Sequence, residues 1–130
     1  MSTRKAQKKR SKKSENASRV AQVPKDHASK VLSNVPKEQG FYFYSSIGNP
    51  TGAVACSFDE FCRTVRSSPA ESLEFHLTRG DFENWIRFLG DLELANQIEK
   101  LRAGNLPIEQ MMHTFVSAIE ERYELLQKSA

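Results

Sequence analysis

The feature that most constrains this chain is the confinement of its aromatic side chains to one part of the sequence. All eight Phe, all three Tyr and the single Trp lie between Phe41 and Tyr123. A segment without large apolar groups cannot bury enough surface to offset the entropy lost when its backbone is ordered. The sequence therefore predicts a disordered tail over residues 1–36 and a compact domain over residues 37–130.

Charge follows nearly the same division. Residues 1–40 carry eleven Lys or Arg and three Asp or Glu, a net of +8, whereas residues 41–130 carry eight and thirteen, a net of −5. The cationic residues singled out as candidate polyanion contacts are Lys5, Lys8, Lys9, Arg10, Lys12 and Lys13. This density of positive charge has two interpretations, and the sequence does not decide between them. In one, the tail contacts nucleic acid or a ribonucleoprotein. In the other, it is a solvated tail that keeps an acidic body soluble.

Other large classes of protein are disfavoured by composition. No apolar run reaches the roughly 20 residues that a transmembrane helix needs, and no apolar stretch typical of a secretory signal follows the N-terminal charges. We therefore expect a cytoplasmic protein that binds no membrane and has free thiols. Cys56 and Cys62 fit no metal-binding spacing and no His/Cys cluster accompanies them, so neither a metal nor a cofactor is expected.

Residues 41–56 predict an antiparallel β-hairpin. The first strand opens with alternating Phe and Tyr, and a Gly-Asn-Pro-Thr-Gly run supplies the turn. Because a two-stranded hairpin is marginal by itself, one of its faces is expected to pack on helices. If Phe41 and Phe43 point inward, Tyr42 and Tyr44 form an outward face that can stack on a base or cover a partner. The opposite assignment of the two faces is the alternative.

Apolar residues at helical spacing predict five helices after the hairpin. Ser57 and Ser68 are predicted N-caps of the first two, and Pro107 opens the last and longest. Asp81 and Asp91 each follow a Gly that ends the preceding helix, so both are also predicted caps. The predicted fold class is mainly α (α+β), with one small antiparallel β-hairpin packed on about five short helices and a disordered N-terminal tail.

The densest polar and aromatic stretch is centred on His76, which lies on or beside the apolar side of a predicted helix. In one interpretation His76 is a base or a ligand. In the other it is a partly buried structural histidine bonded to a carbonyl or a carboxylate. Because no second residue forces a catalytic role, His76 is a weak catalytic candidate. The residues that could form a binding site around it are Glu74, Arg79, Asp81 and Trp85. For Trp85, core packing is the alternative.

One sequence pattern is similar to a known family. Its most specific part is the Phe-His-x-x-Arg-Gly-Asp-Phe-x-x-Trp core from Phe75 to Trp85, and the aromatic strand and the Gly-Asn-Pro-Thr-Gly turn add to it. With these motifs the chain resembles a family of small prokaryotic, mainly archaeal proteins that consist of a domain of unknown function. The resemblance covers about half of the chain, from residue 41 to residue 101, and leaves out the lysine-rich tail. It implies an intact domain and assigns no catalytic role.

These observations predict a non-enzymatic small binding protein whose basic tail contacts nucleic acid or a ribonucleoprotein. The first alternative is a protein- or ligand-interaction module with an incidental solubilising tail. The second is a small enzyme centred on His76. A protein partner or a second copy of the chain could also bind at an exposed hairpin edge or along the last helix.

Overall fold

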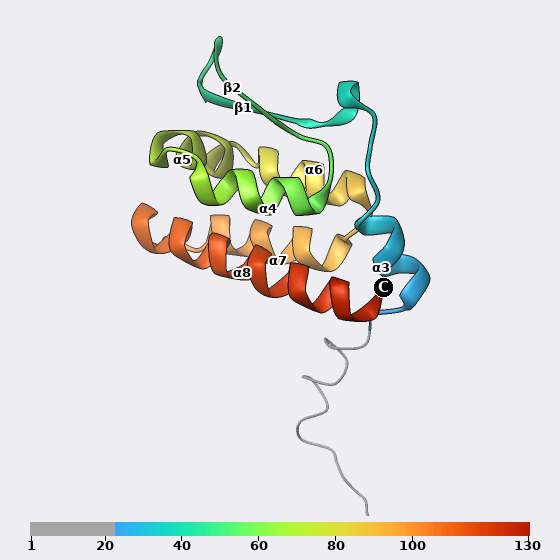
Figure 1. Ribbon diagram of the computed structural model, residues 1–130. Helices are drawn as coiled ribbons and strands as arrows, with labels where there is room; N and C mark the ends of the chain where they lie inside the picture. The colour runs from blue at the N-terminus through green and yellow to red at the C-terminus, as the bar shows by residue number, and fades with distance from the viewer. Residues whose placement is uncertain (1–22) are drawn as a thin grey trace, which may run out of the picture.

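The computed structural model describes residues 23–130. Within them the chain forms six α-helices, one 3₁₀ helix and a two-stranded sheet (Figure 1). In chain order these are α3 (Lys25–Val31), η1 (Lys37–Gln39), β1 (Phe41–Ser46), β2 (Asn49–Ala55), α4 (Phe58–Ser67), α5 (Ala70–Arg79), α6 (Asp81–Leu89), α7 (Leu92–Ala103) and α8 (Ile108–Ser129). The predicted fold class, mainly α with one antiparallel hairpin, is confirmed. None of the helices in this described part is long and apolar enough to cross a membrane.

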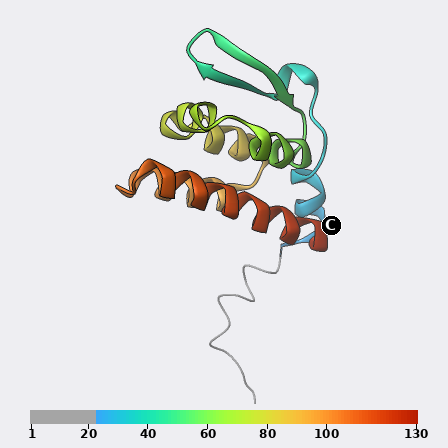
Figure 2. The ribbon, with the colours of Figure 1, turned by 60° about the vertical axis from the view of Figure 1, so that its left-hand side comes forward.

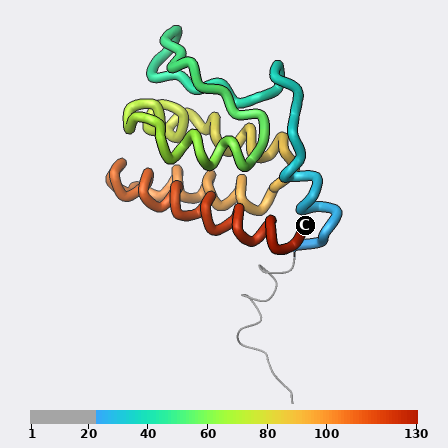
Figure 3. The backbone as a smooth tube through the Cα atoms, in the orientation of Figure 1, coloured from blue at the N-terminus to red at the C-terminus, as the bar shows by residue number. Residues whose placement is uncertain are grey.

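The elements stack in three layers. The hairpin is the outer layer, α4, α5 and α6 form the middle one, and α7 and α8 form the third (Figures 1 and 2). β1 packs on α5 and β2 packs on α4, while α8 contacts α3, α4, α5 and α7. The segment after α3 runs along one end of the helical layers to reach the hairpin (Figure 3). The described chain therefore starts beside α8, on the opposite side of the domain from the hairpin.

An aromatic cluster forms the centre of the core. The ring of Phe61 in α4 lies 5.7 Å from that of Phe41, 5.5 Å from that of Phe82 and 5.2 Å from that of Trp85, measured between centroids. Phe82 in turn stacks on Phe115 of α8 at 4.6 Å. Edge-to-face and offset arrangements at these distances are the favourable ones for aromatic pairs. The cluster thus joins the hairpin to all the helical layers.

The packed chain begins N-terminal to the predicted boundary at residue 36. Ala28 and Val31 of α3 are fully buried, and α3 packs on α8. Farther along, the backbone N–H of Val35 donates to the carbonyl of Cys56 at 2.8 Å. This helix has a weak periodic signal in the sequence, because it is seven residues long and buries only one alanine and one valine. α3 is therefore part of the packed chain although it precedes residue 36.

Two of the predicted N-caps are confirmed. The hydroxyl of Ser57 accepts a hydrogen bond from the N–H of Glu60 at 3.1 Å at the start of α4. The carboxylate of Asp91 accepts one from the N–H of Leu94 at 3.2 Å at the start of α7. These caps fix the helix starts to the residues that the sequence indicated.

The other two predicted caps are wrong. Ser68 does not cap α5, because its hydroxyl donates backwards to the carbonyl of Thr64 at 2.7 Å and Pro69 occupies the cap position. Asp81 does not cap α6 either, because Gly80 is the cap residue and Asp81 is already the first residue of the helix. The carboxylate of Asp81 is therefore free to make a different contact.

Candidate ligand-binding site

β1 turns its two Phe rings into the core and its Tyr side chains away from it. Phe41 and Phe43 are buried, whereas Tyr42 is 44% exposed and Tyr44 is half-buried. The strand pairs antiparallel with β2, with Phe41 opposite Ala55. Successive side chains of a strand point to opposite faces, so turning both phenylalanines inward places both tyrosines on the outer face. This is the inward orientation of the phenylalanines that the sequence favoured.

α5 holds the backbone of Tyr44 with two side chains one helical turn apart. The hydroxyl of Ser72 donates to the carbonyl of Tyr44 at 2.8 Å, and the N–H of Tyr44 donates to Nε2 of His76 at 2.8 Å. Residues four apart lie on the same face of a helix, so this pair presents a donor and an acceptor side by side. We call this arrangement the Ser72–His76 clamp. It takes the place of a neighbouring strand along part of β1.

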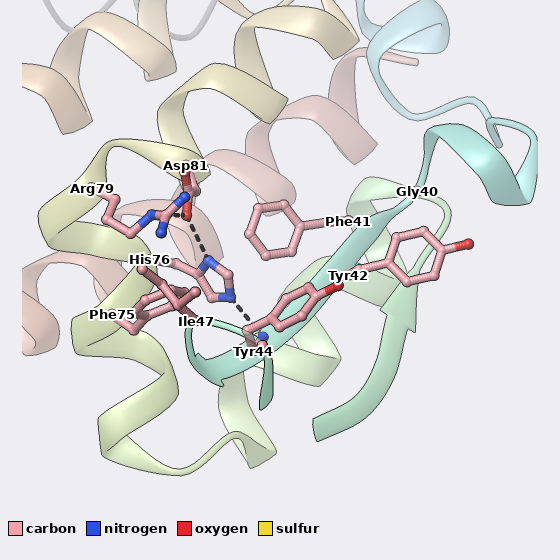
Figure 4. A pocket seen from close by; sticks show the side chains of 10 residues that line it. Gly40, Phe41, Tyr42, Tyr44, Ile47, Phe75, His76, Arg79 and Asp81 are labelled. Atoms are coloured by element: carbon pink, nitrogen blue, oxygen red, sulfur yellow. Dashed lines mark hydrogen bonds and ion pairs between the residues drawn. The ribbon is translucent and has the colours of Figure 1, made fainter. Parts of the chain in front are cut away.

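Both ring nitrogens of His76 are used within the fold. The residue is 3% exposed, its Nδ1 lies 2.9 Å from Oδ2 of Asp81, and its Nε2 accepts from the backbone of Tyr44 (Figure 4). Because a backbone N–H can only donate, Nε2 carries no proton and Nδ1 carries the proton that it donates to Asp81. Burial lowers the pKa of His76, and the hydrogen bond with Asp81 opposes this effect. His76 is thus neutral near pH 7 with no nitrogen free to take a proton from a substrate.

The turn between α5 and α6 brings Asp81 to His76. Gly80 has φ 81° and ψ 12°, a left-handed conformation that a side chain disfavours, and it separates the two helices by itself. The chain reverses so sharply that Asp81 faces the last turn of α5. Its Oδ2 accepts from Nδ1 of His76 and lies 3.1 Å from Nε of Arg79.

Arg79 is held on two sides at the rim of this site. Its Nε faces Asp81, and its guanidinium carbon lies 4.7 Å from the centre of the Phe75 ring. The side chain is 49% exposed. Its two terminal nitrogens make no hydrogen bond to any residue between 23 and 130. The ion pair with Asp81 and the aromatic ring of Phe75 together restrict the orientations open to this guanidinium.

These side chains surround a pocket of about 310 Å³ between the hairpin and the α5–α6 junction (Figure 4). Its walls are mostly apolar and aromatic, and Arg79 and Asp81 are the charged groups of its lining. At the tip of the hairpin, Ile47 is 81% exposed beside it. The lining residues are Gly40, Phe41, Tyr42, Tyr44, Ile47, Gly48, Phe75, His76, Arg79 and Asp81. This composition, apolar walls with a few convergent polar groups, is that of a small-ligand site.

The structure brings together some of the residues that the sequence proposed and separates others. Those that line the pocket are Tyr42, Tyr44, His76, Arg79 and Asp81. Glu74 is exposed on α5 and does not line it. Trp85 is buried in the core, and its indole N–H donates to the carbonyl of Gln39 at 2.9 Å, so core packing is the correct interpretation. The tail residues Lys5, Lys8, Lys9, Arg10, Lys12 and Lys13 lie outside the described residues.

Among the residues of the site that were not proposed from the sequence, Ser72, Phe75 and Ile47 each have a local signal. Ser72 precedes His76 by four residues, and that spacing signals a shared helix face. Phe75 precedes Arg79 by the same spacing, which allows the stacking that is observed. Ile47 is a lone aliphatic residue among turn formers, which is a sign of an exposed apolar side chain. Each of these sequence signals is local. None of them shows by itself that the residue belongs to a shared site.

Metal ligands do not gather at this site or elsewhere in the described chain. Between residues 23 and 130, no three His, Cys, Asp or Glu side chains are placed to hold a metal ion together. Cys56 is half-buried, Cys62 is buried, and both are free thiols.

The fold and the pocket define a small helical domain with a β-hairpin laid over one face of its helices. The chain matches the family of unknown function DUF5752 over residues 17–120, and it belongs to that family. The match includes α3, in agreement with a domain that starts before residue 36. The chain matches no curated protein and no solved structure.

Proposed function

We propose that this protein is a non-enzymatic binding module whose binding site is the pocket between the hairpin and the α5–α6 junction. The observation that carries the proposal is the engagement of both nitrogens of His76 in a pocket that is otherwise open to a ligand. A general base needs a free nitrogen within reach of a substrate proton. A binding site needs a shaped apolar surface with a few fixed polar groups, which this pocket has.

Two parts of the pocket wall are held by contacts within the fold. The backbone of Tyr44 is held by the Ser72–His76 clamp, and Arg79 is held by Asp81 and a stacked ring. Side chains that are already ordered lose less entropy on binding. Another hollow, about 530 Å³, lies over β2 and α4, but most of the exposed surface of its lining is polar. It lacks the aromatic walls that favour a ligand.

Fragment binding followed by amide NMR spectra of the full chain tests this proposal. Neutral, acidic and basic aromatic compounds are added, and binders are expected to shift the amides of Tyr44, Gly48 and Arg79. Ile47→Ser is expected to weaken binding several-fold because it removes an apolar wall. Phe88→Ser is the matched control, since Phe88 is 51% exposed on α6 and does not line the pocket. The proposal is wrong if no compound shifts these amides, or if the shifts map to another surface.

The division of charge supports a second, separate proposal: the lysine-rich tail contacts nucleic acid or a ribonucleoprotein. Six closely spaced cations can neutralise phosphates and release counterions. The described chain starts on the α8 side, away from the hairpin. We place this activity in the cytoplasm, and the two free thiols support a reducing compartment.

A variant in which all six tail cations are replaced by Ser tests this second proposal. The full chain is expected to bind RNA or duplex DNA with an affinity that falls steeply as salt is raised, and the variant is expected to lose most of that binding. Ile47→Ser is the control and is expected to bind nucleic acid as the parent does. Equal binding by the parent and the six-cation variant contradicts the role of the tail.

We further propose that the chain self-associates through the hairpin edge or α8. The backbone N–H and carbonyl of Tyr44 are taken by the Ser72–His76 clamp, so pairing with a second copy falls to the outer edge of β2. Analytical ultracentrifugation over a range of protein concentrations is expected to show a dimer. Val54→Pro is expected to disrupt this dimer. A monomer at all concentrations excludes this mode.

A further inference from the structure

We infer that the ligand of the pocket carries a carboxylate that pairs with Arg79 and an apolar body that lies along the rings of Phe41 and Tyr44. This inference rests on the proposed function and names the chemical class of the ligand. It follows from three features of the pocket: the geometry of one guanidinium, the distribution of polar groups, and the local charge.

The guanidinium of Arg79 is held by its neighbours but keeps N–H donors that make no hydrogen bond within residues 23–130. Nε lies 3.1 Å from Oδ2 of Asp81 and the guanidinium carbon lies 4.7 Å from the centre of the Phe75 ring, while the terminal nitrogens make no hydrogen bond in this part of the chain. Two parallel N–H donors match the two oxygens of a carboxylate. Because the side chain is already held, forming this fork costs less conformational entropy than it would for a free arginine.

The charged groups of the pocket lie together at one end of it. In Figure 4, Arg79 and Asp81 lie at one end of the group, Tyr42 lies at the other, and His76, Phe41 and Tyr44 lie between them. The nitrogens of His76 are occupied, so this ring presents carbon surface to the pocket. A ligand with one polar head and an apolar body therefore fits this order of side chains. The volume of about 310 Å³ is at the lower end of the range for small-ligand pockets, enough for an aryl or branched alkyl body.

The local charge disfavours a doubly negative head group. Arg79 is the cation of the lining, Asp81 is its anion, and His76 is neutral, so the empty rim is close to neutral. A monoanion adjacent to Arg79 leaves one excess negative charge there. A phosphate dianion leaves two, with the carboxylate of Asp81 only 3.1 Å from the Nε of Arg79. A planar carboxylate is thus preferred over a phosphate monoester.

Three matched probes test the head group: 3-phenylpropionate, its neutral amide 3-phenylpropanamide, and 2-phenylethyl phosphate. Binding to the full chain is followed through the amides of Tyr44, Gly48 and Arg79. The carboxylate is expected to bind most tightly and the amide about tenfold or more weaker, because a charge-assisted pair is lost. Arg79→Gln is expected to reduce the affinity for the carboxylate to that for the amide. Arg79→Lys is expected to recover little of it, since it restores the charge without the fork.

Arg66→Gln is the matched control. Arg66 is also an exposed arginine whose Nε pairs with a carboxylate, Glu120 at 2.8 Å, but it lies on α4 outside the pocket. Its substitution is expected to leave the affinity unchanged. An unchanged amide spectrum away from the pocket shows that the Arg79 variants are folded.

Two further probes distinguish the sources of the carboxylate. Short peptides ending in Phe, with a free or an amidated C-terminus, are compared with 3-phenylpropionate. Tighter binding of the free peptide than of 3-phenylpropionate indicates a protein C-terminus, and weaker binding indicates a small organic acid. Either result supports the inference.

Three results overturn it: equal binding of acid and amide, tighter binding of the phosphate, or unchanged binding by Arg79→Gln. In each of these cases the pocket amides still shift, so the proposed binding function stands while the ligand class is wrong. If no probe shifts them, the proposed function fails as well.

Discussion

Replacing His76 with Phe tests how much of the fold depends on the hydrogen bonds of one ring. Phe preserves a planar ring that can pack near Phe41 and Phe82, whose centroids lie 4.8 and 5.4 Å from the imidazole. It removes the acceptor for the N–H of Tyr44 and the donor to Asp81. The substitution therefore changes hydrogen bonding with little change in packing.

The expected loss in the free energy of unfolding is the sum of two costs, one for the N–H of Tyr44 and one for the carboxylate of Asp81. The N–H of Tyr44 is partly buried under the hairpin, and leaving such a donor unpaired costs about 1–2 kcal/mol. Asp81 is partly exposed and can return to water, so its lost hydrogen bond costs about 1 kcal/mol. The free energy of unfolding should fall by about 2–3 kcal/mol in total. At roughly 4 °C per kcal/mol for a domain of this size, Tm should fall by about 8–12 °C.

Urea unfolding followed by circular dichroism near neutral pH measures this loss, with His113→Phe as the control. His113 is exposed on α8, so its substitution should change the free energy of unfolding by less than about 0.5 kcal/mol. Hydrogen exchange should also show that the Tyr44 amide loses protection in the His76 variant. The reasoning is refuted if His76→Phe unfolds like the parent, or if the Tyr44 amide keeps its protection.

The same ring should make stability depend on pH. Burial lowers the pKa of His76 in the folded state, whereas the unfolded chain has a histidine pKa of about 6.5. The unfolded state therefore binds a proton more readily, so stability is full above about pH 6.5 and falls as the pH drops below that value toward the folded pKa. His76→Phe should remove this part of the slope. An identical slope in parent and variant would assign it to other groups.

Three further predictions concern other parts of the fold. Ser72→Ala removes the hydroxyl half of the Ser72–His76 clamp from a buried site and should lower the free energy of unfolding in urea by about 1 kcal/mol; no change would argue against the clamp. Arg122→Leu should cost roughly 3–5 kcal/mol in the same assay. The reason is that it leaves buried Asp91, now bonded at 2.7 and 2.9 Å, without its ion-pair partner; a loss below about 1 kcal/mol would contradict this. Burial raises the pKa of Cys62 to about 12, so a thiol reagent should label Cys56 and spare Cys62 until the chain unfolds; equally fast labelling of both would refute it.

The elements that could be predicted are those with strong local signals. The hairpin and α4 to α8 are announced by alternation, by helical spacing and by caps such as Ser57 and Asp91. α3 could not be found in this way because it contributes few apolar side chains, and its place depends on α8, far away in sequence. A short helix that is stabilised mainly by tertiary packing leaves little trace in its own residues.

The sequence could predict which residues lie near one another in the site, but not the role that each residue has there. Alternation placed Tyr42 and Tyr44 together, and helical spacing put His76 on a buried side. The bond that decides the role of His76 comes from a backbone N–H 32 residues away, and no side-chain pattern encodes it. The role of Asp81 was mistaken for a similar reason. A cap and an ion pair use the same residue type, and only the left-handed turn at Gly80 selects between them.

The contacts that occupy both ring nitrogens of His76 are the ones that shape the pocket. The ring binds the strand that carries Tyr44 through one nitrogen and, through the other, the carboxylate that orients Arg79. A substitution at His76 must therefore disturb both stability and binding. Arg79→Gln and Ile47→Ser act at exposed positions and should disturb binding with little effect on stability. If His76 were a catalytic base on an independently stable scaffold, its substitution would instead spare the fold, so comparing these variants separates a structural histidine from a catalytic one.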